Sequence, residues 1–435
     1  MTHGADSSGA SRRGVLRNAG AILVSRFTGM ALRTVGVLIA AAYLGTEGWG
    51  LLGFLSSSLE VFRVLASAGM DTASIRFVSL ARDEAGRIVG RLFALKAVTS
   101  LTAYLALVAV AYTIPAYRER APLLLLLGLG LFPQTLGTTL QARFQAEHAM
   151  ARLIPVQVVQ GALYVVGVML LRHQGAGVWG FIVLTVALDA AQFLATLFVA
   201  RRSWPDALAV RAIRYVPSFA RAILVPSISL GLLELIVMLY SRLNVYFLER
   251  TGGLAAVGQY YAALRVSEPL LMVAGALAMS SYPVLSKLVQ EKDYAEIGDM
   301  FRKYSLRAAG ITMLVATATS VLSRPILTFV KPEFAGGAGA LSALAFATAF
   351  MFQNQLSSIV LHSFGKFHYV TACALVNLCV FLTSASLLVP RFGPTGAGVT
   401  TLITEGINTI VQLGLVVLVL RNARKQGVST TQRAA

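Results

Sequence analysis

The sequence has few charged residues, few acids in particular, and almost no cysteine. Of its 435 residues, 13% are charged, and 19 Asp and Glu stand against 37 Lys and Arg. A soluble domain carries roughly twice that charged fraction, so the composition excludes an ordinary soluble protein. With 56% hydrophobic residues and a mean hydropathy of +0.71, the chain is typical of an integral membrane protein.

Signatures of enzymes, cofactors and metals are also missing. The two cysteines, Cys373 and Cys379, lie in one apolar segment at a spacing that gives neither a CxxC pair nor a shared helix face, so we interpret them as packing residues. The five histidines show no HExxH spacing, and no glycine-rich phosphate loop leads into a lysine. We therefore predict no enzymatic activity, no cofactor and no metal site.

What the sequence does contain is a succession of long apolar runs. Twelve of them are long enough to cross the hydrocarbon core, at residues 21–44, 49–75, 92–114, 121–142, 153–171, 178–200, 222–248, 256–283, 305–330, 338–361, 369–389 and 396–420. The sequence predicts an all-α membrane protein with twelve transmembrane helices. The polar stretch 284–304, which mixes both signs of charge, is predicted to be an interfacial helix.

The basic residues indicate an orientation. Most of the 37 Lys and Arg fall in alternate connections, such as Arg76–Lys96, Arg201–Arg221, Lys287–Arg307 and the tail Arg421–Arg433. The positive-inside rule then places both termini in the cytoplasm. The net charge of +18 follows from this topology and from contact with anionic membrane lipids, and nucleic acid is not an expected partner.

An internal repeat divides the chain into halves. Tyr43–Gly50 before the second span resembles Tyr246–Gly253 before the eighth, and Leu171–Gly177 before the sixth resembles Pro390–Gly398 before the twelfth. The predicted order is a cytoplasmic tail (1–20), an N-lobe of six helices (21–200), a cytoplasmic linker (201–221), a C-lobe of six helices (222–420) and a C-terminal tail (421–435). Two parallel pseudo-symmetric lobes favour a transporter that works by alternating access, with its substrate between the halves.

Charged side chains inside these spans are the candidate binding residues. A charge at the membrane centre costs about 2.5 to 3.5 kcal/mol, so such residues are retained for a ligand, a water-filled path or a bundle interior. The predicted substrate-binding residues share this placement: Arg26 and Arg33 on one face of the first span, Glu60 and Arg63 on the second, and Arg265 and Glu268 on the eighth. If the arginines converge, their surplus positive charge suits a diphosphate, whose oxygens match the guanidinium fork.

Several alternatives stay open. Each i,i+3 pair also fits a neutralised pair that fills a bundle interior, and Arg242 has Glu234 and Glu249 on its own helix as structural partners. The other acids in the spans, namely Asp71, Asp189 and Glu405, fit either proton or sodium coupling or simple pairing. The amides Gln134, Gln141 and Gln353–Gln355 fit contacts to sugar hydroxyls or hydrogen bonds between helices.

Several motifs resemble the polysaccharide flippases of the multidrug, oligosaccharidyl-lipid and polysaccharide exporter (MOP) superfamily, which is related to the MATE transporters. The motifs are Ser25–Gly29, Leu44–Gly50, the run from Val257 to Ser286, and Pro390–Gly398. The resemblance implies a flippase in the bacterial inner membrane that translocates an undecaprenyl-diphosphate-linked oligosaccharide for surface polysaccharide synthesis. It also implies polymerase and export partners.

The same segments are similar to lipid II flippases, in which arginines on helices 1, 2 and 8 line a cavity for the lipid diphosphate. By motif these positions fall on Arg26, Arg33, Arg63 and Arg265. The sodium site of some relatives would fall on Glu234 and Asn377, but Phe381 stands where a further acid is expected, so proton or sodium coupling stays open. The rival readings are a cation-coupled multidrug exporter of the same superfamily and a non-transporting scaffold for polysaccharide assembly.

Overall fold

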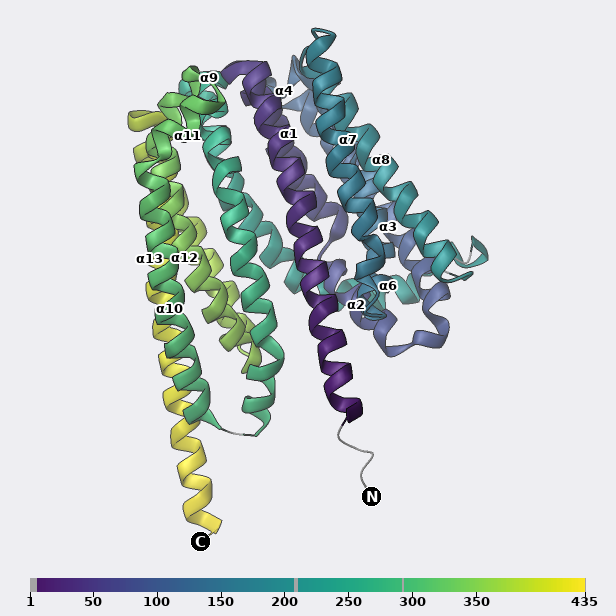
Figure 1. The fold of residues 1–435 in the computed structure, drawn as a ribbon, viewed down its shortest axis with the longest axis vertical. Helices are drawn as coiled ribbons and strands as arrows, with labels where there is room; N and C mark the ends of the chain where they lie inside the picture. Colours follow the sequence, from purple (N-terminus) through teal and green to yellow (C-terminus); the bar gives the residue numbers. More distant parts are fainter. Residues whose placement is uncertain (1–5, 207–209, 292, 435) are drawn as a thin grey trace. The chain divides into compact units, whose positions relative to one another are not determined.

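The computed structural model describes residues 6–206, 210–291 and 293–434, and the regular elements in this part of the chain are all helical (Figure 1). The chain forms two compact units, which we describe separately. Unit 1 comprises Met1–Tyr43 and Leu55–Leu235, and unit 2 comprises Leu44–Phe54 and Ile236–Ala435.

Unit 1 is built mainly from the first eight helices. They are α1 (Asp6–Ser67), α2 (Met70–Leu80), α3 (Ala85–Thr113), α4 (Pro115–Arg118), α5 (Ala121–Gly128), α6 (Leu131–Ala146), α7 (Ile154–His173) and α8 (Val178–Ser203), with short 3-10 turns at Arg82–Glu84, Met150–Leu153 and Val210–Ala212. Apolar residues of α2, α3 and α6 form its core with Ala220 and Ile223. Helices α7 and α8 run side by side (Figure 1).

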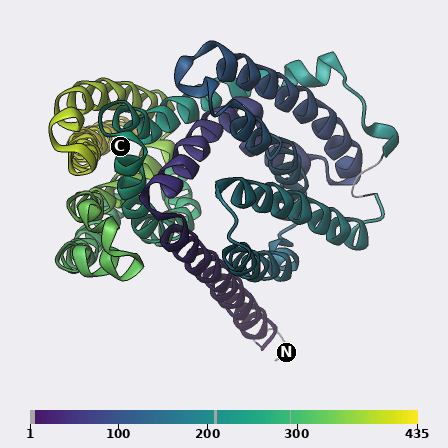
Figure 2. The same cartoon turned by 90° about the horizontal axis from the view of Figure 1, so that it is seen from above.

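Unit 2 is built from the remaining helices. They are α9 (Pro217–Gln290), whose first part belongs to unit 1, α10 (Tyr294–Val321), α11 (Ser323–Val330), α12 (Ala338–Ser363) and α13 (Phe367–Ala434), with a 3-10 turn at Pro332–Gly337. Helix α12 packs between α10 and α13, and Figure 2 shows these helices, in green and yellow, packed together.

Three helices are too long for one crossing of a membrane. Helix α9 has 74 residues, about 111 Å of helix, against a hydrocarbon core of about 30 Å. Helices α1, α9 and α13 each contain a non-helical glycine, namely Gly45, Gly253 and Gly393. The described residues provide up to nine apolar spans if the bent α10–α11 pair counts as one. Counting each glycine-broken helix as two spans makes the architecture consistent with the predicted twelve.

The glycine breaks show the internal repeat in the backbone. Gly45 (φ 69°, ψ −176°) and Gly253 (φ 70°, ψ −172°) adopt the same conformation, which residues with a Cβ rarely occupy. The separation in sequence between Gly45 and Gly253 is the same as that between Gly50 and Gly258 and between Glu60 and Glu268. The repeat predicted from the sequence is therefore present, but its register at Tyr43–Gly50 and Tyr246–Gly253 was wrong by a few residues.

The repeated glycines Gly50 and Gly258 allow two helix starts to cross within unit 2. A Cβ added to Gly50 would lie 1.9 Å from the carbonyl oxygen of Leu254, and one added to Gly258 would lie 1.9 Å from that of Thr46. Such close backbone approach is typical of small residues at membrane helix contacts. The segment Leu44–Phe54 is anchored to unit 2 in this way.

Some predicted boundaries were wrong. The second span does not run unbroken to residue 75, because the helix stops at Ser67 and resumes at Met70 after Ala68 (φ 47°) and Gly69 (φ 70°). The predicted interfacial helix at 284–304 does not exist as a separate element. Instead, α9 continues to Gln290 and α10 starts at Tyr294, where the Asp293 carboxylate caps the helix by accepting a hydrogen bond from the Glu296 backbone N–H at 3.0 Å.

Candidate substrate site

The best-defined group of intramembrane charges lies on α9 in unit 2. Arg265 Nη1 donates to Glu268 Oε2 at 2.5 Å, and Arg242 Nη1 lies 3.6 Å from the other oxygen, Glu268 Oε1. All three side chains are partly or mostly buried, and they come from the two successive spans of α9, with Arg242 before the break at Gly253 and the other two after it. Two guanidinium groups thus share one carboxylate.

Aromatic rings hold the Arg265 guanidinium in place. It lies over the Tyr261 ring at 4.6 Å and also donates to the Tyr261 hydroxyl. Tyr261 packs in turn on Trp49 at 5.4 Å, and both rings are only 2% exposed. Because Tyr261, Arg265 and Glu268 follow each other at helical spacing, one face of α9 orients the cation. Arginine stacks on aromatic rings better than lysine does, and a pre-oriented fork loses little entropy when it binds an anion.

The charged residues of unit 1 form a different, mixed group. Arg33 and Arg63 are exposed, and both are close enough to act on the charge of Asp189 in α8. Asp189 Oδ2 also accepts a hydrogen bond from Gln134 Nε2 at 2.7 Å. Arg63 acts as well on Glu234, which is exposed at the unit 1 end of α9.

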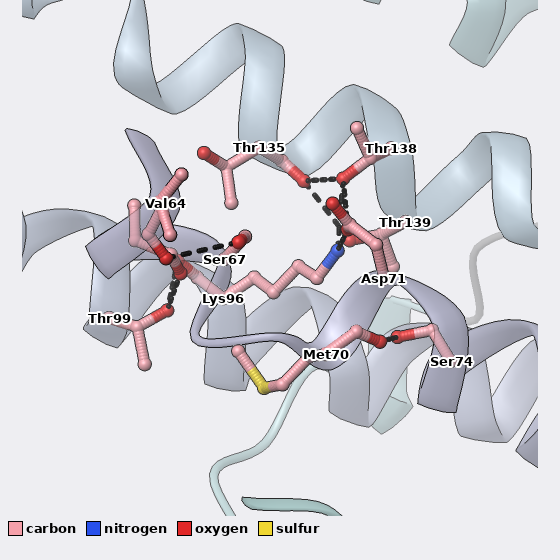
Figure 3. Close-up of polar contacts among 11 residues, drawn as sticks. Val64, Ser67, Met70, Asp71, Ser74, Lys96, Thr99, Thr135, Thr138 and Thr139 are labelled. Atoms are coloured by element: carbon pink, nitrogen blue, oxygen red, sulfur yellow. Dashed lines mark hydrogen bonds and ion pairs between the residues drawn. The ribbon is translucent and has the colours of Figure 1, made fainter. Parts of the chain in front are cut away.

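A buried ion pair in unit 1 was missed by the sequence analysis (Figure 3). Lys96 Nζ donates to Asp71 Oδ1 at 2.5 Å and to the Thr138 hydroxyl at 2.9 Å, and the Lys96 side chain is completely buried. The pattern of basic residues predicts that Lys96 lies in a cytoplasmic connection, but the structure places it inside α3. The sequence does contain a signal for this pair, because the acid Asp71, on the preceding helix in an otherwise apolar stretch, requires a partner.

This pair changes the expected balance of charge. Among the described side chains, unit 1 places Arg33, Arg63 and Lys96 with the acids Asp71, Asp189 and Glu234, and the half-buried Glu60 is a further acid of this unit. Within unit 1 the described basic and acidic side chains therefore form a mixed group. The surplus of positive charge expected where the four arginines converge stays a prediction.

The remaining acid, Glu405, belongs to a buried polar network of unit 2. Its side chain accepts from Asn354 Nδ2 at 2.7 Å, and Asn354 Oδ1 accepts from the Thr409 hydroxyl at 2.8 Å. Gln353 Nε2 donates to Ser305 at 2.5 Å. For Gln353 and Asn354 the structure thus shows hydrogen bonds between helices, the alternative to sugar contacts.

Some predicted site residues are not brought together. The side chain of Arg26 lies outside the described part of the structure. The other predicted residues fall in different units. Unit 1 contains Arg33, Glu60, Arg63 and Glu234, and unit 2 contains Arg265, Glu268 and Asn377, so convergence of the four arginines stays a prediction.

The predicted ion-coupling residue Asn377 is buried and hydrogen-bonded to Tyr240, and Phe381 beside it is also buried. The described residues contain no group of three or more His, Cys, Asp or Glu placed to hold a metal ion.

Comparison with known proteins identifies the family. The family described as "Polysaccharide biosynthesis protein" matches residues 15–289, more than half of the chain. The chain belongs to this family. No curated protein matches it.

Solved structures show the fold of this family member. An inward-facing multidrug resistance MATE family transporter of the MOP superfamily matches at 15% identity with a TM-score of 0.77, covering 91% of this chain and 96% of that one. An outward-facing structure of such a transporter matches at 15% identity and a TM-score of 0.68, covering 94% and 96%. A MOP superfamily transporter from Pyrococcus furiosus, described as having a binding pocket of reverse polarity, matches with the same identity, TM-score and coverages.

These findings confirm the expected all-α fold class and the expected polysaccharide family. The protein is a multi-pass membrane protein with a MATE-like fold. The matching family is one of polysaccharide biosynthesis, and the matching folds are those of MATE family transporters, so the expectation of a transporter in place of an enzyme stays a proposal.

Proposed function

We propose that this protein flips an undecaprenyl-diphosphate-linked oligosaccharide from the cytoplasmic to the outer leaflet of the bacterial inner membrane. The observation that carries the proposal is the Arg242, Arg265 and Glu268 group, which gathers two guanidinium groups around one carboxylate on the membrane helix α9 of a polysaccharide-family protein. In the proposed orientation both termini are cytoplasmic, and the two lobes alternate in access.

The chemistry of this group suits a diphosphate. At an effective dielectric constant of about 20, each guanidinium contact with a phosphate charge at about 4 Å contributes about 4 kcal/mol, which offsets the cost of keeping an arginine in the membrane. Glu268 holds both guanidinium groups while the site is empty, and an entering diphosphate competes with it for the same donors. Because Tyr261 and Trp49 fix Arg265, binding requires little reorganisation.

A second function is favoured by the acids of unit 1. Asp71, Asp189 and Glu234 form a mixed group of the kind that suits an organic cation, and the matching folds include multidrug transporters. This candidate is a cation-coupled multidrug exporter.

In either case Glu234, Asn377 and the buried Glu405 are the residues that we propose for proton or sodium coupling. For the flippase, polysaccharide polymerase and export proteins are the proposed partners.

The test is leaflet reorientation of an undecaprenyl-diphosphate-linked glycan in proteoliposomes. We expect flipping by the parent chain and a loss of at least tenfold in Arg63→Ala and in Arg265→Ala, because each removes a charged contact worth more than about 1.4 kcal/mol. Arg172→Ala is the matched control, since Arg172 is an exposed arginine at the end of α7 and should leave the rate unchanged.

The outcomes separate the candidates. Unchanged flipping in both arginine variants would contradict the diphosphate site. A folded parent that flips no lipid-linked glycan in any ion gradient, but that exports an organic cation such as ethidium, would replace the flippase with the multidrug exporter.

A further inference from the structure

Two arginines lie against one tryptophan at the end of unit 1 where α6 and α8 end and α7 begins. Arg143 lies in the last turn of α6, Arg152 lies just before the start of α7, and Trp204 follows the last residue of α8. The Cζ atom of Arg143 is 4.8 Å from the centroid of the Trp204 ring, and that of Arg152 is 5.5 Å from it. We call these three residues the Trp204 cluster. Because all three helices belong to apolar spans, the cluster lies at the level of a membrane surface.

Packing fixes the cluster in place. The Trp204 ring meets the ring of the buried Phe144 edge-on, with 4.9 Å between the two centroids. Two residues further on, the backbone of Asp206 lies against the start of α3, where a Cβ added to Gly86 would be 2.1 Å from the Asp206 carbonyl oxygen. The chain after α8 is therefore anchored to two other helices, and the charged groups around Trp204 have defined positions.

Arg143 is a buried guanidinium with too few acceptors. The residue is 5% exposed, and its Nη2 donates to Asp206 Oδ1 at 3.0 Å. Among the residues that the structure describes, nothing accepts a hydrogen bond from its Nε or Nη1, although both atoms are buried. Buried donors without acceptors cost free energy. Nη1 and Nη2 form the end of one planar fork, so an anion with two oxygens there satisfies both nitrogens, whereas Asp206 satisfies one.

The carboxylate of Asp206 can be exchanged for another anion. Its side chain is 57% exposed, and an ion pair whose carboxylate remains in water contributes little to stability. Arg152 is exposed and, in the described part of the chain, has no ion pair of its own. Arg201 and Arg202, also exposed, add positive charge in the last turn of α8. An anion that arrives from the membrane surface thus meets Arg152 in the open and replaces Asp206 at Arg143.

The chemistry and the place of the cluster favour a lipid phosphate. A guanidinium fork matches phosphate oxygens, and basic pockets between transmembrane helices on the cytoplasmic side bind acidic lipid head groups. In the orientation that we propose for the chain, this end of unit 1 faces the cytoplasm. Inorganic phosphate offers similar oxygens, but it has no acyl chains to hold it at the bilayer.

We propose that the Trp204 cluster binds the phosphate of an anionic membrane lipid such as phosphatidylglycerol. The phosphate oxygens bind Arg152 and take the place of Asp206 at Nη1 and Nη2 of Arg143, while the acyl chains stay in the bilayer. This site goes beyond the proposed transport, and it does not depend on which substrate the protein carries.

The test is lipid binding by the purified, delipidated full chain in detergent, measured by native mass spectrometry as the affinity for the first bound lipid. We expect the parent to bind phosphatidylglycerol more tightly than phosphatidylcholine. Arg143→Gln and Arg152→Gln should each weaken the binding of phosphatidylglycerol by about tenfold, the effect of one lost charge-assisted contact. Asp206→Asn should strengthen it by about threefold, because the competing carboxylate is gone.

Each kind of variant has a matched control. Arg172→Gln removes an exposed arginine at the opposite end of α7 from Arg152 and should leave both affinities unchanged. Glu84→Gln releases Arg87 from an exposed ion pair of 3.2 Å. It changes the net charge as Asp206→Asn does but leaves the cluster intact, so the affinity for phosphatidylglycerol should stay at the parent value.

The outcomes decide the site. Arg152→Gln and Arg143→Gln that bind phosphatidylglycerol as tightly as Arg172→Gln would overturn it, and so would Asp206→Asn that binds no more tightly than Glu84→Gln. If Arg143→Gln does not fold, the variants of the two exposed residues, Arg152 and Asp206, carry the test. Displacement of the bound lipid by an excess of inorganic phosphate would overturn the lipid site and assign the cluster to a soluble phosphate.

Discussion

The buried pair of Lys96 and Asp71 predicts an asymmetric response to mutation. The Lys96 side chain is 0% exposed, whereas that of Asp71 is 44% exposed. Asp71→Asn therefore leaves an ammonium group in the protein interior without its carboxylate, with the neutral Thr138 hydroxyl as its remaining hydrogen-bond acceptor. Lys96→Met removes the buried charge and fills its space with an apolar chain of similar length, while Asp71 keeps water and its hydrogen bond from Thr138.

The magnitudes follow from the exposures. Removing one partner of a fully buried pair costs about 3 to 5 kcal/mol, but water screens the half-exposed Asp71, and Glu234 also acts on Lys96. We therefore expect Asp71→Asn to lower the free energy of unfolding by about 2 kcal/mol. Lys96→Met should cost about 1 kcal/mol or less. The double variant should resemble Lys96→Met, because no unpaired charge remains inside.

The measurement is the apparent melting temperature of the purified full chain in detergent, for the parent, both single variants and the double variant. The expected order of stability is parent, then Lys96→Met and the double variant together, then Asp71→Asn. The reasoning is refuted if Lys96→Met is as destabilising as Asp71→Asn, or if adding it to Asp71→Asn restores nothing.

Two further predictions concern the repeated glycines. Gly258→Ala should destabilise the chain by at least about 1 to 3 kcal/mol, because its Cβ meets a backbone oxygen at 1.9 Å. The control is Gly414→Ala, which has open space around it and should be neutral or slightly stabilising. Equal melting temperatures for the two variants would contradict the close crossing of the two helix starts. In Gly253→Ala the added Cβ meets no neighbouring atom, so the melting temperature of this variant reports backbone strain alone. We expect the free energy of unfolding to fall by about 1 to 3 kcal/mol, because residue 253 has a positive φ. An unchanged melting temperature would show that this turn tolerates a Cβ.

Most of the fold could be predicted from the sequence, because the membrane restricts which backbone structures can cross it. Apolar runs of sufficient length must be helices, since no water in the hydrocarbon can satisfy a free backbone. The turn signals around Gly45, Gly253 and Gly393 likewise marked where long helices break, and those breaks are present. Breaks inside spans were not foreseen, because the apolar pattern continues through Ala68 and Gly69 without interruption.

The sequence by itself determined which charged side chains lie inside membrane spans, where their insertion free energy must be offset by a partner or a ligand. It also predicted Arg265 and Glu268 as a pair from their spacing on one helix. Only the tertiary structure decided their other partners. Arg242 joins Glu268 from a distant part of α9, and Lys96 joins Asp71 from α3. The physical reason is that helical spacing fixes neighbours within about one turn, whereas contacts between helices depend on packing, on breaks and on register that no local pattern records.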